Sequence, residues 1–261
     1  MSDTKKSPTT QSVDVIQKIV YAYLKPLGFR KHGRTMHRFV DEDISQVITL
    51  QNGCPAKGVF GVLWVDLGIR VPECAQRQFV VTAPLKKYYH EYECNIRSTL
   101  GVFPDGKEKI YDLDEDSEKI GEDIVKQLEN DVIPVFDVLN SRDAILAHRA
   151  EFPRFDRFSN HLILLEESMI AGRRGDLEEA TRLFNAHYRN VLAEYKRKIE
   201  YGSQVYLKKG KWIMYRNART NENEKVIAAE DGFVTIYDAN RGHLSHLEKL
   251  AKELEIELYT S

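Results

Sequence analysis

The residues whose spacing is most typical of chemistry lie in the segment from Gly28 to Thr35, which reads Gly-Phe-Arg-Lys-His-Gly-Arg-Thr. A phosphate-binding loop has this spacing with lysine in place of Arg34, and its backbone amides and its lysine hold the phosphates of a nucleotide. Such a loop follows a strand and begins a helix, so that the N-terminus of the helix faces the phosphates. Here the flanking patterns predict a helix before the segment and a strand after it. Nucleotide binding is therefore not predicted.

The same part of the chain is basic, because no acidic residue occurs between positions 25 and 38. Local positive charge of this kind can hold an anion or an acidic partner, and the candidate binding residues are Arg30, Lys31, Arg34 and Arg38. Lysine and arginine also protect exposed strand edges from pairing with other chains, so a solvated hairpin edge is the competing interpretation.

Two further groups of residues have the types that metal sites use, but not the surroundings. His243 and His246 are three apart, which can place two imidazoles on one face of a helix, but no glutamate accompanies them as a metallopeptidase requires. Asp105 and Lys107, with Glu91 and Glu93 upstream, are similar to residues of restriction-like nucleases. Those residues project from a strand to hold Mg²⁺, whereas Pro-Asp-Gly predicts a turn here. The sequence predicts no cofactor and no metal site, and it assigns no catalytic residue.

The overall composition limits the classes of partner and the compartment. Lys and Arg number 38 and Asp and Glu 40, so a formal net charge of -2 gives no chain-wide attraction for nucleic acid. RNA binding at the basic segment stays open as an alternative. No apolar run approaches the roughly 20 residues that span a bilayer, and the first residues lack the apolar stretch of a signal peptide. We expect a cytoplasmic protein without membrane contact.

The three cysteines, Cys54, Cys74 and Cys94, agree with that compartment. Their number is odd, they are widely spaced, and they form no Cys-x-x-Cys pair. Such a set is typical of a reducing environment, where free cysteine behaves as a small core residue.

In the first part of the chain, apolar periodicity predicts helices around an antiparallel sheet. A helix from Ser12 to Leu24 is ended by Pro26 and Gly28. The predicted strands are 35–40 and 46–51, which form a hairpin about the turn 41–43, then 59–70 and 92–98. A helix with an acidic outer face follows between 112 and 131, and Pro134 should kink or break it.

In the second part, two helices precede a small β/α region. Ser159 caps a helix to about Ile170, and Asp176 with Glu179 begins a longer one that Gly202 ends. Hairpins are predicted at 205–215 and 226–237, then a helix at 244–254 and a strand at 256–259. The predicted organisation is a flexible segment 1–11, an α+β domain 12–150, a connector at 152–158, and a helical hairpin plus small α+β region at 159–261.

The first domain resembles a known family. The residues that carry the resemblance are Leu24-Lys-Pro-Leu-Gly28-Phe29, Arg38-Phe39, Val47 to Gln51 and Asp66-Leu67-Gly68-Ile69. From Val15 to about Leu139 the chain is similar to the bacterial domain of unknown function 4304 family. The resemblance covers the N-terminal half only and implies a bacterial origin and a small α+β fold. It implies no activity.

Together these patterns predict an α+β protein whose work is recognition. We expect a non-enzymatic binding or accessory protein with a protein partner, for example an immunity protein or a regulator beside a defence system. The alternative is a metal-dependent nuclease or other hydrolase whose residues are brought together from distant parts of the sequence.

Overall fold

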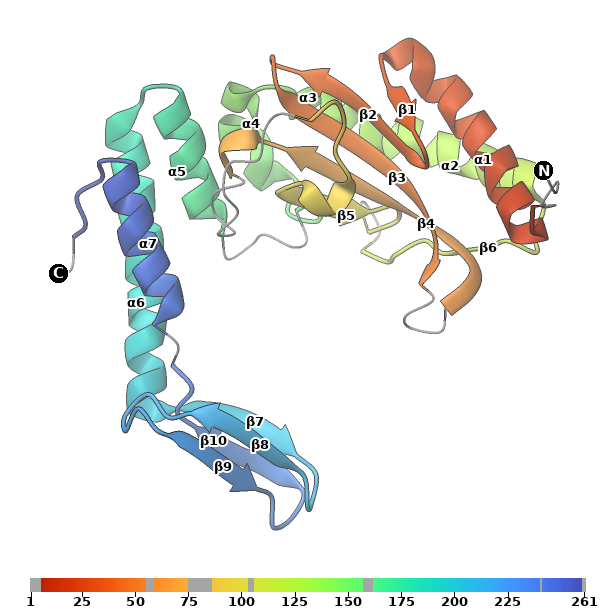
Figure 1. The fold of residues 1–261 in the computed structure, drawn as a ribbon. Coiled ribbons are helices and arrows are strands. Elements are labelled where there is room, and N and C mark those ends of the chain that lie inside the picture. Colours follow the sequence, from red (N-terminus) through yellow and green to blue (C-terminus); the bar gives the residue numbers. More distant parts are fainter. Residues whose placement is uncertain are drawn as a thin grey trace, which may run out of the picture. The chain divides into compact units, whose positions relative to one another are not determined.

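The computed structural model describes residues 6–54, 59–74, 86–102, 106–156, 162–239 and 241–259. Contacts divide the chain into two compact units, residues 1–174 and 175–261, and each is described by itself (Figure 1). Both combine helices with antiparallel strands, so the predicted α+β class is confirmed. Among the described helices, none has both the length and the apolar character that a bilayer crossing requires.

The N-terminal unit is built on one antiparallel sheet with the order β1-β2-β3-β4-β5, and β6 also pairs with β4. The strands are β1 (Arg30–His32), β2 (Thr35–Val40), β3 (Ile44–Cys54), β4 (Val59–Arg70), β5 (Ile96–Thr99) and β6 (Tyr111–Asp112). The predicted hairpin of β2 and β3 is confirmed, as is the long strand β4. The strand predicted from Tyr92 begins only at Ile96, because the turn η4 (Glu91–Glu93) is closed by a capping box between His90 and Glu93.

The first helix is longer than its apolar spacing predicts. Helix α1 (Pro8–Leu24) begins four residues before Ser12, because Ser7 is its N-cap: the backbone N–H of Thr10 donates to Ser7 Oγ at 3.3 Å. Proline at the first helical position costs no hydrogen bond, since that N–H has no partner within the helix. The short turn η1 (Lys25–Leu27) follows, and Gly28 ends it with a φ of 88°.

Helices α2 (Ser117–Gln127) and α3 (Ile133–Val138) follow one another through a helical turn, so of the two predicted effects of Pro134, a kink or a break, the break does not occur. Between them the π-helical turn η5 (Leu128–Val132) widens the backbone by one residue. Such a turn accommodates the proline ring and its missing N–H without ending the helix. Helix α2 approaches α1 closely, because a Cβ at Gly121 would lie 2.9 Å from Ile19 Cδ1.

The two faces of the sheet differ. Leu63, Val65, Leu67 and Ile69 of β4 are all buried, as the alternation predicts, and on this side Gln46 Nε2 donates to the backbone oxygen of Phe136 in α3. The opposite face lies under the segment 86–95, where Val47, Tyr89 and Cys94 form a buried cluster. A Cβ at Gly68 would lie 2.6 Å from Cys94 Sγ, so the glycine of the Asp-Leu-Gly-Ile sequence makes room for this segment.

The remaining helices of the unit are α4 (Arg142–His148), the turn η6 (Arg149–Glu151) and α5 (Ile163–Arg173). Buried Arg149 joins them, because its guanidinium donates to Asp156 and, at 2.5 Å, to Glu166 Oε2 of α5. The two units divide after Arg174. The two helices predicted as one hairpin therefore fall in separate units, and the predicted cap Ser159 lies outside the described residues.

The C-terminal unit begins with the long helix α6 (Leu177–Tyr201), whose N-cap is the predicted Asp176. It continues with β7 (Ser203–Leu207), β8 (Trp212–Arg216), β9 (Asn223–Ile227), β10 (Gly232–Ile236) and α7 (Gly242–Glu253). The strands lie where predicted, but the two predicted hairpins are wrong: β7 pairs with β10 and β8 with β9. The loop that reverses the chain is 217–222, between the paired strands β8 and β9. In this loop Asn217 Oδ1 accepts a hydrogen bond from the backbone N–H of Arg219 at 2.8 Å.

The chain end is not a strand either. The side chain of Asn185 in α6 donates to the backbone oxygen of Glu257 at 2.8 Å and accepts from the backbone N–H of Tyr259 at 2.7 Å. These two bonds take the place of the ladder that the apolar alternation at 256–259 predicts.

Candidate functional site

The structure separates the four predicted binding residues. Arg30 and Lys31 are exposed on the edge strand β1, where successive side chains point to opposite faces. Arg34 lies in the turn after β1, with its Nη2 3.7 Å from Asp14 Oδ1. Arg38 is only 14% exposed and already bonds to Asp137 Oδ1 and Gln46 Oε1, each at 2.6 Å. Lys31 and Arg34 both lie near Asp14, whereas the guanidinium of Arg38 is already engaged, and the role of the four residues in binding stays a prediction.

The motif-like segment from Gly28 to Thr35 forms β1, a tight turn at Gly33 and the start of β2. No helix follows it, so its backbone cannot present the amides of a helix N-terminus to a phosphate. What the segment does provide is Lys31, which lines a groove along α1.

This groove, which we call the lysine groove, has a volume of about 460 Å³. Its lining residues are Lys6, Asp14, Gln17, Lys18, Tyr21, Ala22, Lys25 and Lys31. Those on α1 recur at intervals of three and four along the flank of the helix. The 3.6-residue period of the helix could have shown Lys18 and Tyr21 beside Lys25 in sequence; only the fold places Lys31 across from them.

Charge in the lysine groove is unbalanced. Four ammonium groups line it with one carboxylate, Asp14, which Lys6 Nζ contacts at 2.6 Å. The hydrogen bond from Lys6 outweighs the opposing desolvation and lowers the pKa of Asp14, so this carboxylate is ionised and already engaged. Lys31 Nζ lies 5.5 Å from the ring centroid of Tyr21, and Lys18 and Lys25 are exposed and form no ion pair with a described residue. The groove therefore offers positive charge to an anion.

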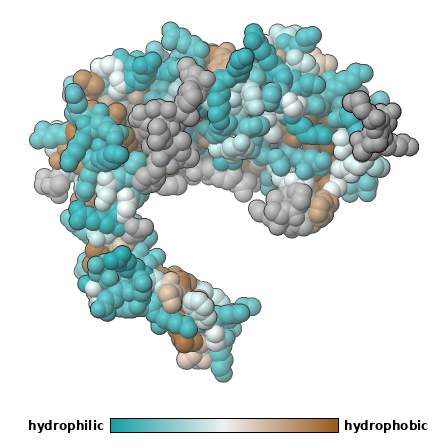
Figure 2. Space-filling view, in the orientation of Figure 1, coloured by the Kyte–Doolittle hydropathy of each residue, from teal (hydrophilic) through white to brown (hydrophobic). Residues whose placement is uncertain are grey.

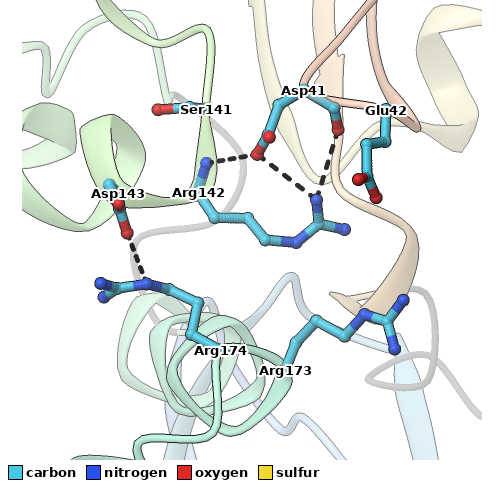
Figure 3. Close-up of a pocket in the computed structure, with 7 residues that line it drawn as sticks. All are labelled: Asp41, Glu42, Ser141, Arg142, Asp143, Arg173 and Arg174. Carbon is cyan, nitrogen blue, oxygen red and sulfur yellow. Dashed lines mark hydrogen bonds and ion pairs between the residues drawn. The ribbon is translucent and has the colours of Figure 1, made fainter.

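A second pocket of the N-terminal unit, the Arg142 pocket, has a volume of about 430 Å³ (Figure 3). It is lined by Asp41, Glu42, Ser141, Arg142, Asp143, Arg173 and Arg174. The guanidinium of Arg142 donates two hydrogen bonds to the carboxylate of Glu73, with Nε–Oε1 and Nη2–Oε2 distances of 2.8 and 2.9 Å. Its Nη2 also donates to Asp43 Oδ1 at 2.8 Å, and its backbone N–H to Asp41 Oδ2 at 3.0 Å.

The carboxylates around Arg142 fix both its charge and the neighbouring turn. Desolvation works against the charged guanidinium, but the bonds to Glu73 and Asp43 outweigh it and raise the pKa of Arg142. Asp41 and Glu42 have φ values of 42° and 64°, a left-handed conformation that is strained for residues other than glycine. Asp41 keeps this conformation while it accepts from Arg142. The pocket is thus a structural link between the β2–β3 turn and α4.

The face of the sheet under segment 86–95 gathers histidines that the sequence gives no reason to place together. The rings of His32 and Tyr88 stack with centroids 3.5 Å apart, and His90 stacks on Tyr92 at 5.2 Å. His37 lies beside them, and its burial lowers its pKa and favours the neutral ring. Within the described residues, no group of three or more His, Cys, Asp or Glu side chains could hold a metal ion.

Asp66, on the same face, has a raised pKa that lies near neutral pH. Burial, with a contribution from Glu91, raises its pKa to about 7, while the bond from Trp64 Nε1 to Asp66 Oδ2 at 3.2 Å opposes that rise. A carboxyl group with a pKa near 7 can accept or donate a proton, as acid–base catalysis requires. The nuclease-like Asp105 lies outside the described residues, and Glu91 is on a 3₁₀ turn.

The remaining candidate residues from the sequence are the cysteines and the histidine pair near the chain end. Cys74 and Cys94 are buried, as predicted, and burial raises the pKa of Cys94. His243 lies against His187 of α6, with ring centroids 5.8 Å apart.

Comparison with known proteins gives one match. The family model described as domain of unknown function 4304 matches residues 20–138. No curated protein and no solved structure is significantly similar to the chain.

Proposed function

We propose that the protein, whose residues 20–138 match the model of the domain of unknown function 4304 family, is a binding protein that captures an acidic segment of a partner protein in the lysine groove. The observation that carries this proposal is the charge of the groove, in which four ammonium groups face one carboxylate that is already paired. A surface of uncompensated like charge is costly for the free protein and is relieved when a ligand of opposite charge binds.

The position of the groove favours a protein segment over another anion. The groove is lined in part by Lys31 of β1, an edge strand that, among the described strands, pairs only with β2. Edge strands offer backbone N–H and C=O groups to an incoming extended peptide, which nucleic acid cannot use. An acidic peptide beside β1 would place carboxylates near Lys18, Lys25 and Lys31.

The proposed role is that of an immunity or regulatory protein in the bacterial cytoplasm. Proteins of this kind neutralise or position a partner without altering it chemically. The odd number of cysteines and the absence of a Cys-x-x-Cys pair in the sequence support a reducing compartment.

The direct test uses fluorescence anisotropy with the full chain and a labelled glutamate-rich peptide, in parallel with a neutral peptide and a single-stranded oligonucleotide. We expect the acidic peptide to bind most tightly. The triple variant Lys18→Glu, Lys25→Glu, Lys31→Glu should weaken that binding about tenfold or more.

The matched control reverses the same number of charges elsewhere. Lys119, Lys126 and Lys196 are exposed and do not line the groove. Their triple change to glutamate should leave binding of the acidic peptide within about twofold once salt is raised to screen long-range effects. Equal weakening by both triple variants, or preference for the oligonucleotide at the groove, contradicts the proposal.

A second candidate function, a hydrolase, is supported by the pKa of Asp66 near 7. It is tested by adding Mg²⁺, Mn²⁺ or Zn²⁺ and measuring the melting temperature, because a specific metal site stabilises the folded state by mass action. A substantial rise that Asp66→Asn abolishes would favour the hydrolase; an unchanged melting temperature would count against a metal-dependent one.

A further inference from the structure

In the C-terminal unit, one pair of strands presents large apolar side chains outward. Trp212 and Met214 of β8 and Ile227 of β9 are 57%, 59% and 59% exposed. Trp212 and Ile227 are register partners, so they lie side by side on the same face of the pair. Figure 2 shows apolar surface on the part of the C-terminal unit that contains the strands. Large apolar groups that stay exposed on a small unit indicate a binding surface.

This face is also basic. Its other outward residues are Arg216, Asn223 and Lys225, so the outward positions of β8 and β9 hold no carboxylate. Lys225 Nζ lies 4.8 Å from the ring centroid of Trp212, and the turn that leads into β8 is Lys208-Lys-Gly-Lys211. The outward positions of β7 and β10 differ, because Gln204, Tyr206, Phe233 and Thr235 carry no charge.

Arg216 connects this face to a pocket of about 650 Å³. The pocket is also lined by Arg241, so two guanidinium groups line it together with one carboxylate, Asp238. That carboxylate already accepts from Ser203 Oγ at 2.8 Å, Arg216 Nε donates weakly to the backbone oxygen of Asn221 at 3.4 Å, and Arg241 lies 3.5 Å from Glu248. The balance in the pocket favours an anionic group.

We propose that the outward face of β8 and β9, with the Arg216–Arg241 pocket beside it, binds single-stranded nucleic acid. Bases stack on Trp212 between the apolar side chains of Met214 and Ile227, and a backbone phosphate binds between the two arginines. Aromatic rings combined with cations and free of carboxylates are the features that bind single strands without sequence preference. A duplex keeps its base faces stacked inside and cannot use the ring. This site lies in another unit from the lysine groove and is independent of it.

The affinity test uses fluorescein-labelled single-stranded DNA and RNA of about 12 nucleotides, a length within the range that small β-domains cover. Fluorescence anisotropy with the full chain should show binding that weakens as salt rises. Trp212→Ala and Arg216→Glu should each raise the dissociation constant about tenfold. Tyr206→Ala, which removes a 52% exposed aromatic side chain from β7, is the matched control and should leave it unchanged.

A second readout follows stacking itself. The chain has two tryptophans, so Trp64→Phe leaves Trp212 as the only one. Addition of the unlabelled single strand to this variant should quench its fluorescence, and the duplex of the same sequence should not. This signal separates base stacking on Trp212 from attraction by charge alone.

Preference for DNA or for RNA is compatible with the site, and either one supports it. The proposal is overturned if Trp212→Ala binds the single strand as tightly as the parent chain, or if the duplex binds equally well. It is also overturned if the chain shows no measurable oligonucleotide binding and the face instead binds anionic lipid vesicles or a second copy of the chain. In that case Trp212→Ala would abolish the vesicle binding or the self-association.

Discussion

Two pockets of the N-terminal unit use charge in opposite ways. In the Arg142 pocket one guanidinium is surrounded by carboxylates of Glu73, Asp43 and Asp41, and every one of its nitrogens has an acceptor. In the lysine groove four ammonium groups share one carboxylate. The guanidinium of Arg142 has no donor left for a ligand, whereas Lys18 and Lys25 of the groove form no ion pair with a described residue.

The comparison separates charge that holds the fold from charge that can bind. Arg142 joins residues 41, 43 and 73 to the start of α4, and its removal would leave neighbouring carboxylates uncompensated. Lys18 and Lys25 contact no described carboxylate, so no ion pair with such a carboxylate stabilises the folded state through them. Substitutions in the two places should therefore affect different measurements.

The largest effect is expected from Arg142→Ala. It leaves Glu73 and Asp43, which are mostly buried, without their counter-charge and should lower the free energy of unfolding by about 3 kcal/mol. Urea unfolding followed by Trp64 fluorescence in a Trp212→Phe background reports this unit. Arg173→Ala is the control, because this exposed arginine lines the same pocket but pairs with no described residue. If Arg142→Ala lowers the free energy of unfolding by less than about 1 kcal/mol, the ion pairs of Arg142 do not hold the fold.

Asp66 is a third case, a carboxyl group whose burial favours the protonated form. Its folded pKa of about 7 exceeds the ordinary 3.8, so the folded state binds the proton more tightly and its stability falls as pH rises between these values. From pH 5 to pH 8 the free energy of unfolding should drop by about 2 kcal/mol from this group. Asp66→Asn should remove that part of the drop in urea titrations at each pH. An identical pH dependence in both proteins would place the titration elsewhere.

The lysine groove should respond to substitution with little change in stability. Lys18→Gln, Lys25→Gln and Lys31→Gln together reduce repulsion between exposed like charges, so the free energy of unfolding should rise or stay within about 0.5 kcal/mol. The same variant should lose affinity for the glutamate-rich peptide. A clear loss of stability would mean that the lysines hold the fold, as Arg142 does.

The smallest effect is expected at the single carboxylate of the groove. Asp14→Asn frees Lys6 and removes the one negative charge, so the acidic peptide should bind about two- to fivefold more tightly. The measurement is the anisotropy titration at low salt, and raising the salt should erase the difference. Weaker binding by Asp14→Asn would indicate that Asp14 itself contacts the ligand.

Local patterns were sufficient to predict much of the sheet and of the helix ends. The alternation at 59–70 predicts β4, and Asp176 predicts the start of α6, because each depends on neighbours in sequence. The same patterns placed β7 to β10 but not their pairing. The turns at 208–211 and 230–232 look like hairpin loops locally, whereas the observed pairing joins residues as far apart as 203 and 236.

The candidate site was predicted only in part, for the same reason. Lys31 was predicted from the local absence of acidic residues, which is visible in sequence. That Arg38 would be engaged by Asp137 depends on a helix from a distant part of the chain. That Lys18 would line a groove with Lys31 depends on how α1 packs beside β1, which the sequence pattern does not give. Likewise, nothing in sequence brings Arg142 to Glu73.

The strands of the C-terminal unit share one register, since Leu207 pairs with Gly232 and Trp212 with Ile227, with four residues between these pairs on each side. The alternation of side chains between the two faces therefore continues from β7 to β8 and from β9 to β10. Deleting one residue from 208–211 would turn Trp212 and Met214 inward and Ile213 outward, unless β9 shifted by the same step. Tolerance of these short segments to changes in length should consequently be low, although 208–211 is exposed and polar. Paired deletions in 208–211 and 228–231 should be better accepted than either alone.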